Sequence, residues 1–184
     1  MGKRKLLSHK KYLAFAEATA KGIPTRGVKA ETCRAMFSDV VQSIEREYDS
    51  VPIKSKGSRD DCWLLLVLGG AIQGEGLVVG MGYNHRRSLQ AMIDVCSRHG
   101  LAKGERVLRD FHERINMPRL SRDRLSMYHE EPQLVKLLGR LQEEAHRIEV
   151  CTKHWSQPLI RMMMTDPAAF FEVAPKAVRH KSKR

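Results

Sequence analysis

Residues 62–83 read CWLLLVLGGAIQGEGLVVGMGY, and this stretch decides the fold class. It contains two apolar runs, Trp63–Leu68 and Leu77–Met81, and six glycines from Gly69 to Gly82. A glycine in a helix interior costs up to about 1 kcal/mol relative to alanine, so a continuous helix would be unfavourable here. We expect two short buried strands joined by a Gly-rich connection, with a buried helical hairpin as the alternative.

The segments on both sides of this stretch have helical periodicity. Their apolar residues recur at three- and four-residue steps, which places them on one face of a helix. The spacing predicts helices over Leu6–Ala20, Ala30–Tyr48, Asn84–Gly100 and Glu105–Ile115, and a long helix that opens at Pro132. The predicted fold class is α+β: a mainly helical single domain with a small central strand element. An all-α domain is the alternative.

The length of 184 residues is typical of one compact domain, and an apolar content of 42% is enough for a core. No apolar run reaches the roughly 18 to 20 residues that cross a bilayer. The charged start Met1–Lys5 is not followed by the apolar run of a secretory signal. We therefore expect a cytoplasmic protein with no membrane partner.

The chain is strongly basic, with 33 Lys and Arg against 21 Asp and Glu and a net charge of +12. Residues 1–11 and residues 174–184 each contain five basic side chains and no acidic one. We expect basic flexible tails at 1–11 and 174–184, with a single globular domain at 12–173 between them. A positive excess favours polyanionic partners, and nucleic acid, most of all DNA, is the first expectation.

A basic segment follows the second apolar run. Residues 80–91 read GMGYNHRRSLQA and lead from the expected strand through glycine into the start of a helix with two arginines. Amides at a helix N-terminus carry partial positive charge, and arginine makes bidentate contacts with phosphate. This arrangement predicts a site for a nucleotide or for a phosphate of the DNA backbone.

The same segment resembles the phosphate-binding box of the ParB/sulfiredoxin superfamily, in which a strand, a glycine, a His or Arg, an Arg and a helix follow one another. That superfamily includes small, basic, plasmid-borne fertility-inhibition proteins of the Osa type. The resemblance implies that Gly82, His85 and Arg86 sit at the phosphate site, with Arg87 beside it. It also implies ATP and Mg as ligands, and it makes Glu75 and Arg86 candidates for a catalytic role.

A second basic stretch, Arg98–Arg124, holds eight Lys or Arg against four acids. We expect Arg106 and Arg109 from this stretch, together with the two tails, to contact phosphates. Aromatic residues make up only 6% of the chain, so a base-stacking platform for single strands is not expected.

Two Cys-x-x-His pairs, Cys96 with His99 and Cys151 with His154, have the spacing that lets a helix present sulfur and nitrogen to one metal ion. Together they could form a Cys2His2 zinc site, but 51 residues lie between them and neither pair belongs to a zinc knuckle. We expect no metal site, because buried reduced cysteines with surface histidines explain the same pattern.

These observations predict a nucleic-acid-binding protein of a bacterial plasmid or mobile element that acts in DNA transfer or maintenance. Hydrolysis of a nucleotide or cleavage of DNA is the activity that the resemblance implies. The alternative is a non-enzymatic inhibitor or adaptor that binds a protein partner, or a second copy of itself, through residues 134–148 and the Met162–Phe171 segment. The apolar stripe of that helix consists of Leu134, Leu138, Leu141, Ala145 and Ile148.

Overall fold

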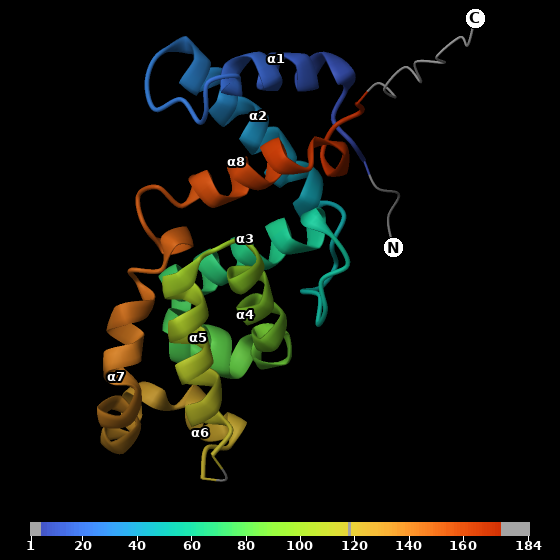
Figure 1. Cartoon of the computed structure of the whole chain (residues 1–184). Helices are drawn as coiled ribbons and strands as arrows, with labels where there is room; N and C mark the ends of the chain where they lie inside the picture. Colours follow the sequence, from blue (N-terminus) through green and yellow to red (C-terminus); the bar gives the residue numbers. More distant parts are fainter. Residues whose placement is uncertain (1–4, 118, 174–184) are drawn as a thin grey trace, which may run out of the picture.

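The computed structural model of the chain describes residues 5–117 and 119–173 (Figure 1). Within these residues all the regular elements are helical, and extended backbone pairs only in isolated bridges such as Leu7 with Phe171. The mainly helical prediction is confirmed. The predicted small central strand element is wrong, and the all-α alternative describes the fold.

Residues 62–83 form a helical hairpin in place of two strands. The first apolar run lies in α3 (Ser58–Gly76), and the second lies in a short π-helical segment, η1 (Leu77–Asn84). Gly76 ends α3 with a φ of 81°, a conformation that favours glycine, and the chain then turns back. A Cβ added at Gly80 would lie 2.9 Å from the carbonyl oxygen of Ala71, so η1 packs directly on α3. The glycines therefore allow two helical segments to touch.

The hairpin supplies the centre of the core. Several of its apolar side chains are fully buried, namely Leu64, Leu65, Leu68, Ile72, Leu77 and Met81. By length and composition alone, Ser58–Asn84 is also long and apolar enough to cross a membrane. The core helix of a globular protein meets the same criterion, so this finding is weak evidence for a membrane span. Here the apolar side chains of the segment pack against the other helices of the chain.

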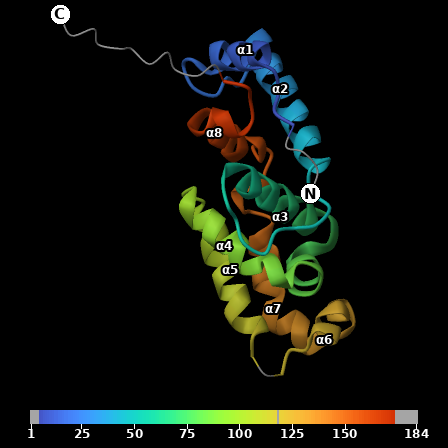
Figure 2. The same ribbon diagram turned by 90° about the vertical axis from the view of Figure 1, so that its right-hand side faces the viewer.

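One half of the molecule consists of α1 (His9–Thr19), α2 (Val28–Glu45) and α8 (Ser156–Thr165), which Figures 1 and 2 show at one end of an elongated body. Phe15 of α1 stacks on Phe171, with ring centroids 5.2 Å apart. The Leu7 amide donates to the Phe170 carbonyl at 3.0 Å. Residues 5–11, predicted as part of a flexible tail, thus belong to the fold, whereas residues 1–4 and 174–184 lie outside the described residues.

The other half consists of α4 (Leu89–Arg98), α5 (Ala102–Ile115), α6 (Arg122–Ser126) and α7 (Pro132–Ala145). Short 3-10 turns connect these helices and the last segment: η2 (Arg86–Ser88), η3 (Tyr128–Glu130), η4 (Glu149–Cys151) and η5 (Pro167–Ala169). The helices predicted over Glu105–Ile115 and from Pro132 are confirmed. Gly100, with a φ of 66°, ends α4, as glycine commonly does at a helix C-terminus.

The apolar stripe of α7 faces inward. Leu134, Leu138, Leu141, Ala145 and Ile148 are between 0% and 6% exposed. The surface predicted for a protein partner or a second copy is therefore occupied by the chain's own core. In the Met162–Phe171 segment, Met162, Met163, Phe170 and Phe171 are buried as well.

Candidate nucleic-acid interface

A groove of about 600 Å³ runs between α5 and α7. Its lining is dominated by basic side chains, with two acids and two leucines. The lining residues are Lys103, Arg106, Asp110, Arg114, Lys136, Leu137, Arg140, Leu141, Glu144 and Arg147. Six cations against two carboxylates give the groove a formal charge of +4.

The two walls of the groove follow from helical spacing. On α5, Lys103, Arg106 and Arg114 lie at intervals that bring them to one face, and residues 136, 140, 144 and 147 do the same on and just after α7. The helices run antiparallel, because Arg106 lies 3.4 Å from Glu144 while Arg114 donates to the Leu137 carbonyl at 3.2 Å. At 1.5 Å per residue, the α5 wall is about 16 Å long.

Glu144 is shared by two of the groove's arginines. Its carboxylate oxygens lie 3.4 Å from Arg106 Nη2 and 3.0 Å from Arg140 Nε, and these two arginine side chains are 64% and 91% exposed. Exposed ion pairs of this kind contribute little to stability, so both guanidinium groups can exchange Glu144 for a phosphate. The side chains of Lys103, Lys136 and Arg147 have no hydrogen-bond or ion-pair partner in residues 5–117 and 119–173.

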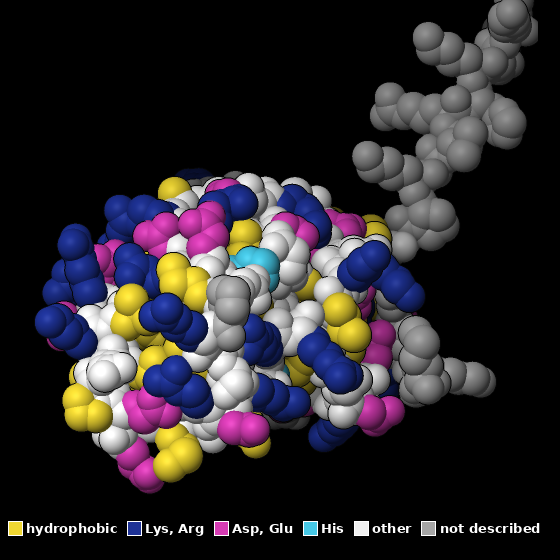
Figure 3. All heavy atoms as spheres, turned by 90° about the horizontal axis from the view of Figure 1, so that it is seen from below, with side chains coloured by type: hydrophobic (Ala, Val, Ile, Leu, Met, Phe, Trp, Pro, Cys, Tyr) yellow, Lys and Arg dark blue, Asp and Glu magenta, His cyan; other side chains and the backbone are white. Residues whose placement is uncertain are grey.

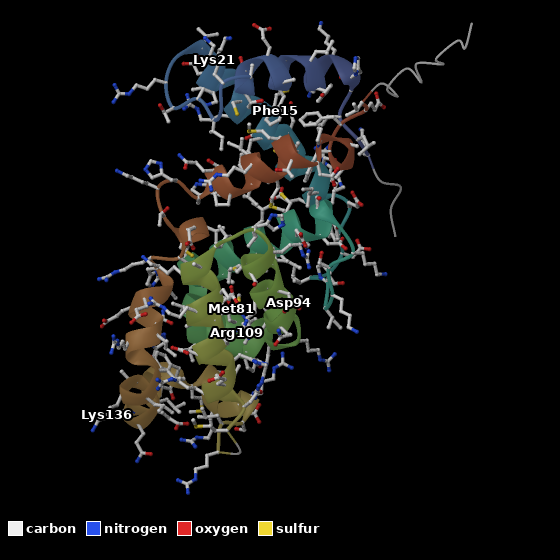
Figure 4. The ribbon with its side chains drawn as sticks, in the orientation of Figure 1. Phe15, Lys21, Met81, Asp94, Arg109 and Lys136 are labelled. Carbon is white, nitrogen blue, oxygen red and sulfur yellow. The ribbon has the colours of Figure 1, made fainter. Side chains whose placement is uncertain are left out.

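The groove lies in the half of the molecule away from α1. Figure 4 places Lys136 on α7 and Arg109 on α5, far from Phe15 and Lys21. Viewed from below, this end shows many Lys and Arg side chains with scattered acids between them (Figure 3). Of the two arginines predicted from this region, Arg106 lines the groove. Arg109 instead pairs with Glu105 at 2.7 Å and is outside the lining.

A larger pocket, of about 1010 Å³, lies around the basic segment predicted to hold phosphate. It joins the loop before α3 to the start of α4 and to α6. The lining residues are Ser50, Val51, Pro52, Ile53, Tyr83, Asn84, His85, Arg86, Arg87, Ser88 and Arg122. The fold therefore brings together residues 50–53 and residues 83–88, which are at least thirty positions apart in the sequence.

Residues 50–53 form one wall of this pocket, and polar contacts hold the loop that contains them. The Ser88 hydroxyl donates to the Val51 carbonyl at 3.5 Å, and the Ser55 hydroxyl donates to Asp61. Asp61 is 3% exposed and also accepts from Arg98 at 2.6 Å and contacts His99 Nε2 at 2.8 Å. The wall is thus tied to both α3 and α4.

Arg86 has a structural role that the sequence did not reveal. Its Nη2 donates to the Ile115 carbonyl at 2.7 Å and to Asn116 Oδ1 at 3.3 Å, and its Nη1 donates to the Leu120 carbonyl at 3.5 Å. Ile115 and Asn116 lie at the C-terminal end of α5, where a cation also interacts favourably with the helix dipole, and Leu120 lies in the connection to α6. The guanidinium predicted to bind phosphate is therefore committed to the chain's own backbone.

The other predicted phosphate residues differ in accessibility. Gly82 is buried, and a Cβ there would lie 3.0 Å from the ring of Phe111, so this glycine serves close packing. Burial lowers the pKa of His85 although Glu75 opposes the shift, so its surroundings favour the neutral imidazole, which has no charge for a phosphate. Arg87 is exposed, and its side chain has no hydrogen-bond or ion-pair partner among the described residues. Only Arg87 remains free to contact an anion.

Arg122 and Tyr83 form a feature of the pocket that sequence reasoning missed. The Arg122 guanidinium carbon lies 4.7 Å above the centroid of the Tyr83 ring, and its Nε donates to the Tyr83 carbonyl at 3.1 Å. This is a cation–π arrangement. The two residues are 39 positions apart, so no local motif signals the contact.

The candidate metal and catalytic residues do not assemble into a site. The described residues contain no group of three or more His, Cys, Asp or Glu that could hold a metal ion. Cys96 is fully buried, and His99 is engaged by Asp61. Burial raises the pKa of the Cys151 thiol to about 12, with Glu149 adding to the effect, so this thiol stays protonated at pH 7.

ATP and Mg fit the pocket poorly. Among the described residues its lining contains no carboxylate, the ligand that usually anchors Mg²⁺ to a protein. Glu75, the candidate catalytic acid, lies outside the lining and accepts a hydrogen bond from Asn84 Nδ2 at 2.6 Å. We therefore derive no catalytic step from these residues.

Comparisons of the chain with protein-family models, with curated proteins and with solved structures find no match.

Proposed function

We propose that this protein binds nucleic acid, and DNA in preference, through the groove between α5 and α7. The observation that carries the proposal is the pair of facing basic walls, with a formal charge of +4 over about 16 Å. Phosphates repeat along a nucleic-acid strand, and so a row of cations at helical spacing can contact several of them at once.

The chemistry of the walls favours the sugar–phosphate backbone over base edges. Arginine forms paired hydrogen bonds with phosphate oxygens, and lysine adds flexible point charges. Three of the groove's cations can bind phosphate without first breaking a side-chain contact to a described residue, namely Lys103, Lys136 and Arg147. Leu137 and Leu141 are the only apolar side chains in the lining, so binding is expected to be electrostatic and to tolerate many sequences.

The adaptor alternative has less support, because the apolar stripe of residues 134–148 is buried in the core. The setting on a plasmid or another mobile element, the role in DNA transfer and the cytoplasmic location remain predictions from the sequence.

Fluorescence anisotropy with labelled DNA at a series of salt concentrations tests the proposal. The double variant Lys136→Ala/Arg147→Ala removes two groove cations that have no described partner. We expect weaker binding and a salt dependence whose slope falls by about 2, because each lost phosphate contact releases about one counterion fewer.

The matched control is Arg34→Ala/Arg161→Ala, which removes the same charge from exposed positions on α2 and α8. It should leave the slope and the affinity nearly unchanged. Equal weakening by both double variants would show that net charge alone, without the groove, accounts for binding. Absence of salt-sensitive binding by the unmodified protein would contradict the proposal outright.

A further inference from the structure

We propose that the pocket around residues 83–88 binds an unpaired nucleobase of the same nucleic acid, so that the ligand is single-stranded where it touches the protein. This inference rests on the function proposed for the groove, and it assigns the pocket a different ligand group. The groove takes the phosphates of the strand, and the pocket takes a base.

The size and walls of the pocket suit a flat heterocycle. Its volume of about 1010 Å³ is large enough for a base with its sugar. Val51, Pro52 and Ile53 form an apolar wall, and the Ile53 side chain is 59% exposed. An apolar wall that remains open to solvent can pack against the face of a base.

Tyr83 and Arg122 provide a stacking partner in the same lining. Bases stack on guanidinium planes as well as on tyrosine rings, and here the exposed Arg122 guanidinium is held 4.7 Å above the Tyr83 ring, so a base can stack on the guanidinium that Tyr83 supports. The exposed Asn84 donates one N–H to Glu75 and keeps its second N–H and its amide oxygen for base edges, and the free guanidinium of Arg87 can hold the adjoining phosphate. Since the lining contains no carboxylate among the described residues, nothing in it repels an anionic strand.

The pocket and the groove each have a lining residue near the C-terminal end of α5. Arg86, which lines the pocket, bonds to the carbonyl of Ile115, and Arg114, which lines the groove, is the preceding residue. A strand that leaves the groove at this end therefore reaches the pocket within a short distance.

The shape of the groove also favours a single strand. The axes of packed helices lie about 8 to 10 Å apart, so the groove along α5 and α7 is a narrow surface furrow that one phosphodiester chain can follow. A duplex would touch only the outer side chains of the two walls. Its bases would also remain paired and could not enter the pocket.

The test compares three short DNA ligands of one sequence: a single strand, the same strand with abasic sites, and the duplex. The abasic strand keeps every phosphate and lacks the bases that would stack. We expect the unmodified protein to bind the single strand most tightly, and the abasic strand about 5- to 150-fold less tightly, the range for loss of one stacked base.

Variants identify the pocket as the source of that preference. Tyr83→Ala and Ile53→Ala should weaken single-strand binding within the same range and leave duplex binding unchanged, and Tyr83→Phe should retain the preference. Val28→Ala is the control for Ile53→Ala, because Val28 is 78% exposed on α2, outside the pocket. Ile53→Ala keeps the test decisive if Tyr83→Ala fails to fold.

The outcomes separate the two proposals. If the groove double variant weakens binding while the duplex and the abasic strand bind as well as the single strand, the pocket inference is overturned and the groove proposal stands. Unchanged single-strand affinity in Ile53→Ala and Tyr83→Ala would also overturn it. If none of the three ligands shows salt-sensitive binding, both proposals are lost.

Discussion

Arg86 lies in the segment predicted to bind phosphate, but its guanidinium group is engaged in hydrogen bonds within the chain. Two of its hydrogen bonds end on Ile115 and Asn116 at the C-terminal end of α5, and a third ends on the Leu120 carbonyl beyond it. Ile115 itself is completely buried. Its neighbour Arg87 makes no such contact with the described residues. Two adjacent arginines, indistinguishable in the sequence, therefore have different roles because only one of them reaches a helix end.

Replacing Arg86 with alanine should destabilise the protein. The carbonyl of Ile115 would lose its partner in a buried setting, which costs about 1 to 3 kcal/mol in the free energy of unfolding. Arg87→Ala should change that free energy by less than about 0.5 kcal/mol. Urea denaturation of both variants measures the difference. Unchanged stability in Arg86→Ala, with loss of a magnesium-dependent turnover, would support the catalytic role that the resemblance implies.

Asp61 makes part of the stability depend on pH. Burial on its own would raise the pKa of this carboxyl group, but hydrogen bonds from His99, Ser55 and Arg98 outweigh burial and hold the pKa below its ordinary value. A lowered pKa in the folded state means that the unfolded state binds the proton first as pH falls. The stabilisation is present above the ordinary carboxyl pKa of about 3.9 and is lost as pH falls through the lower, folded value.

Asp61→Asn should therefore lower the free energy of unfolding at pH 7 and have less effect in acid. We expect a loss of about 2 kcal/mol at pH 7, below the 3 to 5 kcal/mol for a fully buried pair, because Arg98 is half-exposed. Urea denaturation of the variant and the unmodified protein from about pH 7 down to pH 3 follows the gap. A gap that stays constant over this range would show that the carboxylate charge is unimportant.

At the scale of elements, apolar periodicity predicted most helices well. Residues 30–48, 105–115 and the segment from Pro132 each place their apolar residues on one face, and each forms a helix close to the expected bounds. Residues 62–83 differ from the strand prediction because helix propensity alone does not account for the close packing that their glycines allow. Helix propensity describes how much a glycine destabilises the helix that contains it. It does not describe how closely the missing Cβ lets a neighbouring backbone approach.

The glycines of the hairpin differ in how closely another backbone segment approaches them. A Cβ at Gly69 would lie 2.9 Å from the carbonyl oxygen of Val150, and one at Gly80 would lie equally close to that of Ala71. Gly74, in contrast, has nothing within 4 Å of the added atom. These glycines differ only in whether another backbone segment packs against them, and a single sequence does not show which segments pack together.

Gly80→Ala should destabilise the hairpin, and Gly74→Ala should stabilise it. The first substitution forces two backbone segments apart, and we expect a loss of about 1 to 3 kcal/mol. The second adds a good helix former to α3 with free space around it, and a gain of about 0.5 to 1 kcal/mol is expected. Thermal denaturation with circular dichroism checks both. Equal effects of the two alanines would contradict the close contact between η1 and α3.

At the scale of the whole molecule, the net charge is unevenly distributed. Residues 1–4 and 174–184 contain seven Lys and Arg and no acid, so seven of the twelve excess positive charges lie outside the described residues. The groove's formal charge of +4 accounts for most of what remains. Ten of the twelve excess positive charges lie in the two predicted tails, 1–11 and 174–184, so the sequence leaves residues 12–173 nearly balanced. The gathering of basic side chains in one groove depends on how α5 and α7 pair.

The contact between the two ends of the chain affects how the protein can be made. Tyr12 and Phe15 of α1 lie against Phe171, with ring centroids 6.0 and 5.2 Å apart, and Leu7 bonds to both Phe170 and Glu172. A ribosome adds about 5 to 20 residues per second, so roughly 10 to 30 s separate the synthesis of these partners. Helix α1 therefore emerges well before the segment that completes its packing. Until then its aromatic side chains are open to chaperones, and a chain that terminates early never buries them.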